Sequence, residues 1–230
     1  MNTCFFDRID HENKAYWLGF IFADGSVFWN PNKGNYGFSI GLQPNDSSHL
    51  VRLERDLGGT RQPELNETST RLSWYSKQLA QTLINIGIPV RKSYCDTLEV
   101  PSIPTKYHKD FWRGMFDGDG MITFQQKKPH LLPEYKFSLA GSKSALKSFQ
   151  LWGQQKANMN PQKIRRAKNQ KGYSGCFVFY MSGNRQIASV LTALYKDSDL
   201  WLERKHCLYL RLIAQNSQHG YRNIKKYKNP

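Results

Sequence analysis

Two segments of the chain alternate regularly between apolar and polar residues. Between residues 36 and 43 every second position is apolar: Tyr36, Phe38, Ile40 and Leu42. Residues 135–140 repeat the pattern, with apolar side chains at Tyr135, Phe137 and Leu139. A period of two predicts β-strands with one face packed into a core, while the polar face can meet solvent or a ligand.

Each of these strands follows a run of apolar and aromatic residues that ends in Asp-Gly. The two runs are AYWLGFIFADG at 15–25 and DFWRGMFDGDG at 110–120. Gly19 and Gly114 are 95 positions apart, and so are Asp24 and Asp119. Similar helix-like and strand-like segments follow both runs. We therefore predict an internal repeat in which each unit reads helix, strand, strand, helix, strand, strand, helix.

The boundary between the units is predicted near VPSIPTKYHKD, residues 100–110, because two prolines there oppose a continuous helix. This gives an N-terminal unit at 1–103 and a C-terminal unit at 104–230. Each unit ends near a basic dipeptide, Arg91-Lys92 in the first and Arg204-Lys205 in the second. The dipeptides are 113 positions apart, so we expect longer loops in the second unit.

Charge is distributed unevenly between the units. The chain has 33 Lys and Arg against 18 Asp and Glu, a formal net charge of +15. Residues 1–103 carry a net charge of −1 and residues 104–230 carry +16. Such a balance favours a polyanionic partner, most often nucleic acid, over a merely soluble basic surface. The acid-free tail 219–230 is interpreted as a flexible arm.

Other features exclude several classes of protein. The chain has no run of about 18 apolar residues and no secretory signal pattern, so we expect no membrane span and an intracellular location. That location would be the cytoplasm of a bacterium or phage-infected cell, or an organelle. The four cysteines lack the spacing of a metal knuckle and are predicted to be reduced thiols: Cys4, Cys95, Cys176 and Cys207.

The two apolar runs carry small residues at helical spacing. Gly19 lies four positions before Ala23, and Gly114 lies four positions before Gly118. Small residues on one helix face allow two backbones to approach closely, so we predict that the repeat helices pack against each other at Gly19 and Gly114. Gly25 and Gly120, which follow the acids, are expected to close the helices in a left-handed conformation.

Asp24 and Asp119 would then lie at corresponding ends of two neighbouring helices. A carboxylate is poorly placed at a helix C-terminus, where the helix dipole is negative, and two such carboxylates repel each other. A divalent cation with oxygen ligands, such as Mg²⁺, would resolve the conflict and could hold a phosphate backbone. The alternative is that each Asp-Gly is only a turn signal. Asp117 corresponds to Phe22 in the first unit and is a secondary candidate.

The paired motifs WLGFIFADG at 17–25 and WRGMFDGDG at 112–120 resemble those that name the LAGLIDADG homing endonucleases. The resemblance covers nearly the whole chain and implies the single-chain form of that family. It implies an α+β fold of two pseudosymmetric αββαββα halves, whose antiparallel sheets form a saddle for DNA. Phe22 and Arg113 depart from the family pattern, and Arg113 is interpreted as a helix surface residue.

The resemblance also implies roles for matching residues. Asp24 and Asp119 would be catalytic acids and Mg²⁺ ligands, helped by the carbonyls of Ala23 and Gly118, with Mn²⁺ or Ca²⁺ as substitutes in binding. Gln43, whose counterpart is Ser142, would lie near the attacking water. Lys92 and Lys205 would polarise the scissile phosphate. The implied activity is sequence-specific hydrolysis of both strands of a long DNA site by a monomer.

Polar strand faces and loop tips supply the predicted DNA contacts, because Arg and Lys can read guanine, and Asn or Gln can read adenine. The candidates are Asn30, Lys33, Arg61, Arg71, Gln125, Lys127, Lys136, Arg165 and Lys168. Two other functions fit the same resemblance: an intron maturase that binds RNA, and a DNA-binding regulator that does not cleave. Retention of both Asp24 and Asp119 argues against a purely binding role.

Overall fold

The computed structural model describes residues 1–32, 34–90, 92, 98–129, 131–169 and 172–226. The first half contains α1 (Glu12–Asp24), β1 (Gly25–Asn30), β2 (Asn35–Leu42), α2 (Ser47–Asp56), β3 (Glu64–Leu65), β4 (Thr70–Trp74) and α3 (Lys77–Ile86). The second contains α4 (His108–Asp119), β5 (Gly120–Gln125), β6 (Glu134–Gly141), α5 (Lys143–Ala157), β7 (Arg165–Asn169), β8 (Gly172–Ser182), α6 (Asn184–Tyr195) and α7 (Glu203–Lys226). The predicted αββαββα order is confirmed in both halves.

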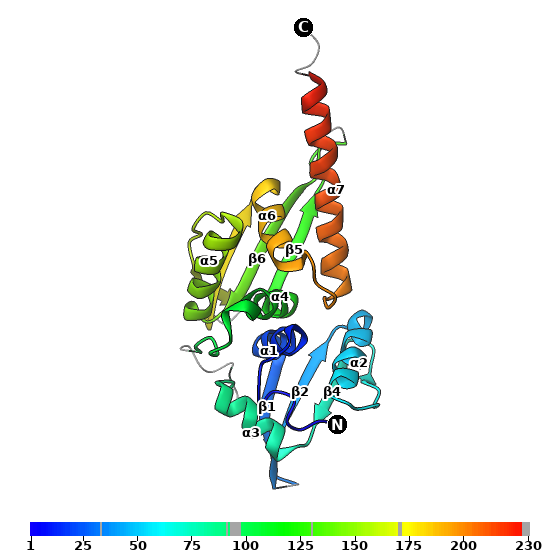
Figure 1. Ribbon diagram of the computed structural model, residues 1–230, viewed down its shortest axis with the longest axis vertical. Helices are drawn as coiled ribbons and strands as arrows, with labels where there is room; N and C mark the ends of the chain where they lie inside the picture. The colour runs from blue at the N-terminus through cyan, green and yellow to red at the C-terminus, as the bar shows by residue number, and fades with distance from the viewer. Residues whose placement is uncertain (33, 91, 93–97, 130, 170–171, 227–230) are drawn as a thin grey trace.

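Each half contains a four-stranded antiparallel sheet, with strand order β1-β2-β4-β3 in the first and β5-β6-β8-β7 in the second. The registers correspond, because Val27 pairs with Phe38 and Ile122 pairs with Phe137. Figure 1 shows α1 and α4 side by side at the centre, with one sheet beyond each of them. The α+β fold with two similar halves is therefore as the sequence predicts, while the division at residue 103 stays a prediction.

Aromatic pairs fill the core between each sheet and its helices. Phe38 stacks on Trp74 with ring centroids 4.3 Å apart, and Phe116 stacks on Phe137 at 4.7 Å. All four side chains are fully buried. The alternation along β2 and β6 thus directs the large apolar residues to the helices and leaves the other face of each sheet polar.

The two motif helices touch through glycine, as predicted. A Cβ on Gly19 would lie 2.0 Å from the carbonyl oxygen of Phe111, and a Cβ on Gly114 would lie 1.9 Å from that of Tyr16. Any side chain at either position would therefore push the backbones apart. The loss of helix propensity at glycine, about 1 kcal/mol, is offset by this close packing.

Gly25 and Gly120 do not adopt the expected left-handed conformation. Their φ angles are −69° and −83°, with extended ψ angles, so each helix passes directly into its strand. Glycine is required there for space. A Cβ on Gly25 would lie 2.5 Å from the carbonyl oxygen of Ile21, and one on Gly120 would lie 2.4 Å from that of Phe116.

Arg113 is fully buried, so its interpretation as a surface residue is wrong. Its guanidinium donates hydrogen bonds to Asp110 (2.7 Å), to the hydroxyl of Ser198 (2.7 Å) and to the carbonyl of Leu200 (2.8 Å). It also lies over the ring of Tyr16, 5.2 Å from the centroid. A buried charge needs such partners, and here they tie α4 to the segment that leads into α7.

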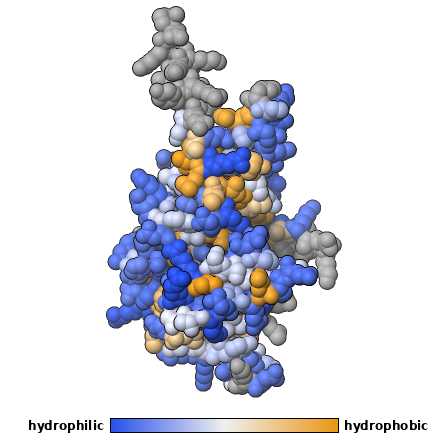
Figure 2. Space-filling model, turned by 90° about the vertical axis from the view of Figure 1, so that its right-hand side faces the viewer, coloured by the Kyte–Doolittle hydropathy of each residue, from blue (hydrophilic) through white to orange (hydrophobic). Residues whose placement is uncertain are grey.

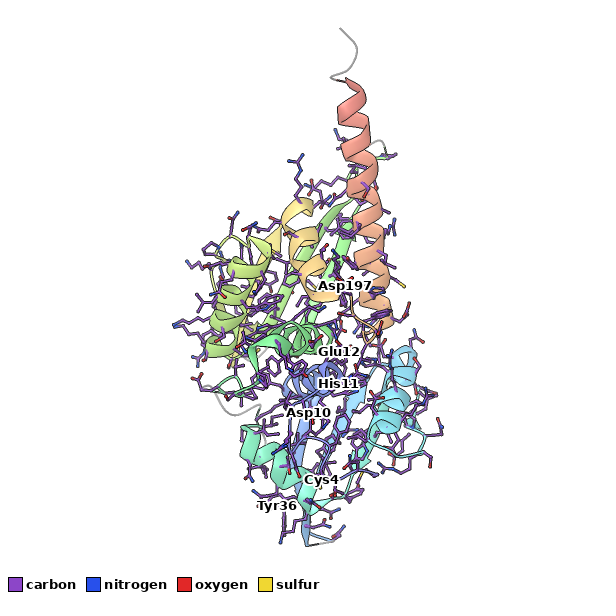
Figure 3. The ribbon with its side chains drawn as sticks, in the orientation of Figure 1. Cys4, Asp10, His11, Glu12, Tyr36 and Asp197 are labelled. Carbon is purple, nitrogen blue, oxygen red and sulfur yellow. The ribbon has the colours of Figure 1, made fainter. Side chains whose placement is uncertain are left out.

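The chain termini differ in their attachment. Near the N-terminus, His11 caps α1 by accepting the amide of Asn13, and Figure 3 shows Asp10, His11 and Glu12 at the start of this helix. At the other end, α7 continues to Lys226 and projects beyond the second half (Figure 1). The tail expected as a flexible arm is thus helical as far as that residue.

Figure 2 shows a largely hydrophilic side of the molecule, with hydrophobic residues gathered mainly below the grey C-terminal segment. No helix within the described part of the chain is long and apolar enough to cross a membrane. Cys4 and Cys207 are exposed cysteines, Cys176 is half-buried with its thiol 3.8 Å from the carbonyl of Gly141, and Cys95 lies outside the described residues.

Replacing Gly114 by alanine is expected to lower the free energy of unfolding by about 1–3 kcal/mol, because the new methyl group meets backbone rather than a flexible side chain. Gly41→Ala is the control, since a Cβ there would meet only Arg71, at 3.5 Å. Urea unfolding of both variants measures the difference. Equal stability of the two variants would contradict close packing of the helices.

Candidate active site

The acids of the two motifs converge at the ends of the paired helices. Asp24 ends α1 and Asp119 ends α4. Asp24 reaches across the interface, because its Oδ2 lies 3.3 Å from the position of a Cβ built on Gly118. Asp119 is more exposed than Asp24 to the space beyond the helix ends. The glycine contact between the helices thus places both carboxylates in one site.

The pKa values of both acids are raised. Burial raises the pKa of Asp24 to about 6, and the nearby charge of Asp119 adds to the effect, while Lys205 and Lys92 oppose it. Limited hydration among the surrounding protein also raises the pKa of Asp119, although its side chain is open to solvent on one side. Two neighbouring carboxylates with raised pKa values form a natural site for a cation.

Two lysines cap the ends of the motif helices. Lys92 donates hydrogen bonds to the carbonyls of Ile21, Phe22 and Ala23 at the end of α1. Lys205, which is 1% exposed, donates to four carbonyls at the end of α4, including those of Phe116, Asp117 and Gly118. Burial lowers the pKa of each lysine to about 8, against the nearby acids, which raise it. Each ammonium therefore neutralises a helix C-terminus directly beside its acid.

The carboxylates of Asp24 and Asp119 could hold a divalent metal only if waters and the substrate supplied the remaining ligands. Within the described residues no group of three or more His, Cys, Asp or Glu side chains could hold a metal ion. Mg²⁺ commonly takes one or two carboxylates together with waters and substrate phosphates, which matches Asp24 and Asp119. The carbonyls of Ala23 and Gly118, predicted as further ligands, already accept hydrogen bonds from Lys92 and Lys205.

Asp117 serves the helix interface and does not join the two acids. It is buried and accepts hydrogen bonds from the hydroxyl groups of Tyr16 (2.8 Å) and Tyr195 (2.5 Å) and from the amide of Leu202 (2.8 Å). Burial raises its pKa, and these contacts oppose the rise. On the other side of the pseudo-twofold axis the corresponding residues, Phe22 and Phe111, pack ring to ring at 5.6 Å.

The residues predicted near the attacking water occupy different environments. Gln43 is exposed just after β2, so its amide is available to a ligand. Its counterpart Ser142 is buried, caps α5 through the amide of Ala145 (3.1 Å) and donates to the carbonyl of Leu98 (2.5 Å). Both side chains at this position are polar, but only that of the first half is exposed to a ligand.

The polar faces of the sheets carry many of the predicted DNA contacts. Arg71 lies over Gly41, its cross-strand partner in β2, and is exposed. By register the same faces carry Asn30 in the first sheet and Gln125, Lys136 and Arg165 in the second. The two sheets thus provide separate polar surfaces on either side of the motif helices.

Other predicted contacts lie elsewhere or are already engaged. Arg61 forms a bidentate pair with Glu54 of α2 at 3.0 Å and packs over the ring of Trp74, which places it on the helical side of its sheet. Lys127 pairs with Glu134 at 2.7 Å, although both remain exposed. Lys168 is exposed beyond the irregularity in β7, and Lys33 lies outside the described residues.

Large apolar side chains also lie on the sheet faces that the sequence predicts to be polar. Phe28 and Tyr75 form an edge-to-face pair on the first sheet, with ring centroids 5.9 Å apart. Tyr180 and Met121, which are 60% and 40% exposed, flank Ser138 on the second sheet. Strand alternation contains the signal, because these residues lie an even number of positions from polar-face residues. Such groups can contact base edges, including thymine methyl groups.

Replacing Lys205 by methionine is expected to cost about 3 kcal/mol of stability, because it leaves the carbonyls at the end of α4 without their donor. Arg204→Met is the control. It removes the same charge one residue earlier, where the arginine is half-exposed and pairs with the buried Asp46, and it should cost less, about 1–2 kcal/mol. Chemical denaturation measures the free energy of unfolding of both variants. Similar losses of stability would show that Lys205 does not hold the end of α4.

His49 predicts a pH dependence of stability. Burial, with the charges of Arg52, Lys205 and Arg204, lowers its pKa to about 3, and its ring lies 2.9 Å from the hydroxyl of Tyr16. The unfolded chain therefore binds one more proton than the folded chain between about pH 6.5 and pH 3, so this group makes stability fall as the pH falls.

The raised pKa of Asp24 has the opposite effect on stability below pH 6. The parent must therefore be compared with a His49→Gln variant, which retains Asp24. Stability of the parent minus that of His49→Gln should fall between pH 7 and pH 4, by about 1.4 kcal/mol per pH unit at most. Thermal or urea unfolding across this range measures it. A difference that stays constant with pH would exclude His49 as the titrating group.

No family model matches the sequence, and no curated protein sequence matches it significantly. Solved structures do match. The meganuclease I-SmaMI bound to uncleavable DNA has a TM-score of 0.59 and 12% identity, over 87% of this chain and 88% of its own. The LAGLIDADG homing endonuclease I-GzeII in complex with its DNA target gives 0.57 and 12%, over 94% and 92%. I-LtrWI bound to target DNA gives 0.57 and 10%, over 99% and 98%. This chain has the fold of the LAGLIDADG homing endonucleases, in the single-chain form with two halves.

Proposed function

We propose that the protein is a metal-dependent endonuclease that cuts both strands of a specific double-stranded DNA site. The observation that carries the proposal is the convergence of Asp24 and Asp119 at the ends of two helices that touch through glycine. A merely structural turn would not need two acids with raised pKa values in one site. DNA in the solved structures of I-GzeII and I-LtrWI, which share the fold, supports duplex DNA as the substrate.

Asp24 and Asp119 would hold the metal, for which we propose Mg²⁺ in catalysis, with Mn²⁺ or Ca²⁺ as substitutes in binding. A structure of I-SmaMI on uncleaved DNA was obtained with calcium ions, which supports a divalent cation in this fold. When bound, such a cation activates water and stabilises the departing oxygen of a phosphodiester. One acid from each half matches one cut in each strand.

The side chains of the protein position the acids on the DNA and neutralise charge at the scissile phosphates. Each acid is fixed by a helix that runs without a turn into a strand, so its position follows that of the sheet on the DNA. Lys92 and Lys205 add positive charge beside the scissile phosphates, which stabilises charge that develops there. A direct hydrogen bond to phosphate requires either lysine to exchange a carbonyl partner for a phosphate oxygen, because several carbonyls accept from each ammonium.

Gln43 is proposed to orient water in the first half, because its side chain is exposed directly after the end of β2. The polar sheet faces are proposed to read the two half-sites, with Arg71 in the first half and Lys136 and Arg165 in the second. A single chain with both halves needs no second copy, so we propose that it acts as a monomer inside the cell. An RNA maturase or a non-cleaving regulator remains an outcome of the test below.

Asp24→Asn and Asp119→Asn are each expected to reduce double-strand cleavage by a hundredfold or more, since a ligand of an activating metal contributes several kcal/mol. DNA binding should persist, because neither residue contributes positive charge. Selection of cleaved sites from a plasmid library in Mg²⁺ supplies the substrate, and Glu67→Gln, at an exposed position far from the site, is the control. Cleavage at the parent rate by either aspartate variant would refute the two-acid site. Binding without cleavage by the parent would favour a regulator, and tighter binding to intron RNA a maturase.

A further inference from the structure

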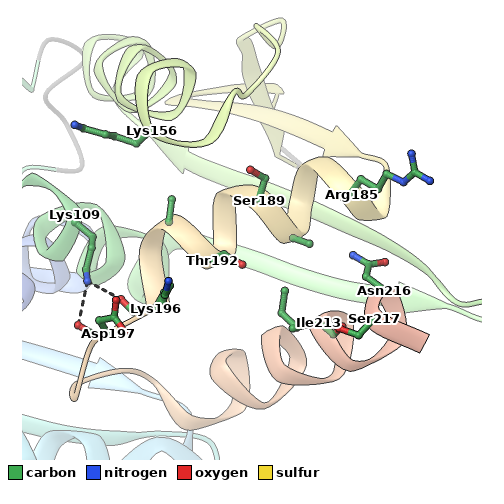
Figure 4. A pocket seen from close by; sticks show the side chains of 12 residues that line it. Lys109, Lys156, Arg185, Ser189, Thr192, Lys196, Asp197, Ile213, Asn216 and Ser217 are labelled. Carbon is green, nitrogen blue, oxygen red and sulfur yellow. Dashed lines mark hydrogen bonds between the residues drawn. The ribbon is translucent and has the colours of Figure 1, made fainter. Parts of the chain in front are cut away.

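A second basic surface lies on the helical side of the C-terminal half. It is a hollow of about 720 Å³ between α6, α7, the end of α5 and the start of α4. Figure 4 shows its cations around the rim: Lys109, Lys156, Arg185 and Lys196. Asp197 is the one acidic side chain among the described residues that line it.

The hollow is separate from the acids and from the polar sheet faces. α6 turns Ile187, Leu191 and Leu194 toward the core and its sheet, whereas Arg185, Ser189, Thr192 and Lys196 follow another face at helical spacing. Lys109 and Asp119 are at opposite ends of α4, about 15 Å apart along the helix. A duplex on the polar face of this sheet would have the sheet between itself and the hollow.

The cations of the rim differ in their availability. Lys109 is held by the carbonyls of Lys196 (2.7 Å) and Asp197 (3.2 Å), so it helps to build the loop. Lys156, Arg185 and Lys196 are exposed, and within the described residues none of them forms an ion pair. Three exposed cations on the rim of one hollow give it a positive potential, which attracts an anion.

The spacing fits an extended anion better than a small one. Arg185 in the first turn of α6 and Lys196, which caps its C-terminus, are eleven residues apart, or about 16 Å along the helix. That length corresponds to about five nucleotides of one strand at 3.4 Å per step. Thr192 and Asn216 add neutral donors between them, the kind of group that contacts phosphate and sugar. Ala188 and Ala193 form part of the floor, and their small side chains keep the hollow open.

We propose that this hollow binds the phosphodiester backbone of a second nucleic-acid segment, apart from the duplex on the sheet faces. Lys156, Arg185 and Lys196 make the phosphate contacts, without sequence preference. The site does not depend on cleavage. The same chemistry suits DNA that flanks the target and bends around the second half, or a structured RNA, and the experiment separates these two sources.

The test compares two triple variants with equal charge. The hollow variant changes the three cations to glutamine: Lys156→Gln, Arg185→Gln and Lys196→Gln. The control changes three exposed cations that do not line the hollow: Arg55→Gln, Lys77→Gln and Lys147→Gln. Both are made in a background with Arg71→Gln, Lys136→Gln and Arg165→Gln, which weakens binding on the sheet faces. Melting curves confirm that both variants stay folded, as expected for exposed positions.

Fluorescence anisotropy with EDTA then measures affinity for a 30-base-pair duplex of random sequence and for an RNA hairpin of similar length, at several salt concentrations. Each lost phosphate contact reduces the slope of log affinity against log salt by about 0.7–0.9. The hollow variant should therefore show a slope shallower by about 2–3 than the control. A change with RNA alone identifies RNA, a change with duplex alone identifies flanking DNA, and a change with both identifies a general backbone site. Equal slopes of the two variants with both probes overturn the proposal.

Discussion

The approach of two helix backbones at Gly19 and Gly114 is the constraint on which the rest of the structure depends. It fixes the distance between the halves, because a side chain at either glycine would collide with a carbonyl of the other helix. The acids inherit their proximity from this contact, and the two sheets inherit their positions on either side of it (Figure 1). The positions of the acids and of the polar sheet faces are thus set by one backbone contact, which dispersion forces at short range hold together.

Electrostatics at the helix ends complements this packing. Carboxylates at two helix C-termini would be unfavourable on their own, since helix dipole and like charge both oppose them. Lys92 and Lys205 answer the first problem by binding the terminal carbonyls. The second problem, the repulsion between the acids, persists in the raised pKa of Asp24, to which burial contributes most and the charge of Asp119 adds. Residual strain of this kind is expected where a charged ligand is to bind.

The sequence predicts those parts of the fold that follow from local periodicity. Alternation defines β2 and β6, and paired small residues define the helix contact, because both signals depend on neighbours within a few positions. Arg113 could not be placed in this way, since its partners Ser198 and Leu200 lie more than 80 residues away and one of them is a backbone carbonyl. The same holds for the carbonyl partners of Lys205. Gly25 and Gly120 differ from the prediction. A glycine at a helix end usually adopts a left-handed conformation, whereas here glycine is required because a Cβ would collide with a backbone carbonyl.

The pair Tyr16–Asp117 and its counterpart Phe111–Phe22 make each half prefer the other half as its partner. One position of the pseudosymmetric interface is polar and hydrogen-bonded, and the equivalent position is two phenyl rings in contact. Two copies of the first half would bury the hydroxyl of Tyr16 against Phe22, and two copies of the second would bury Asp117 against Phe111. Either homodimer would lose the hydrogen bond between Tyr16 and Asp117, at a cost of about 1–3 kcal/mol. Tyr16 would keep only His49, and Asp117 would keep Tyr195 and Leu202, as partners from their own halves. The halves are therefore complementary rather than interchangeable, and separated halves would associate with each other in preference to themselves.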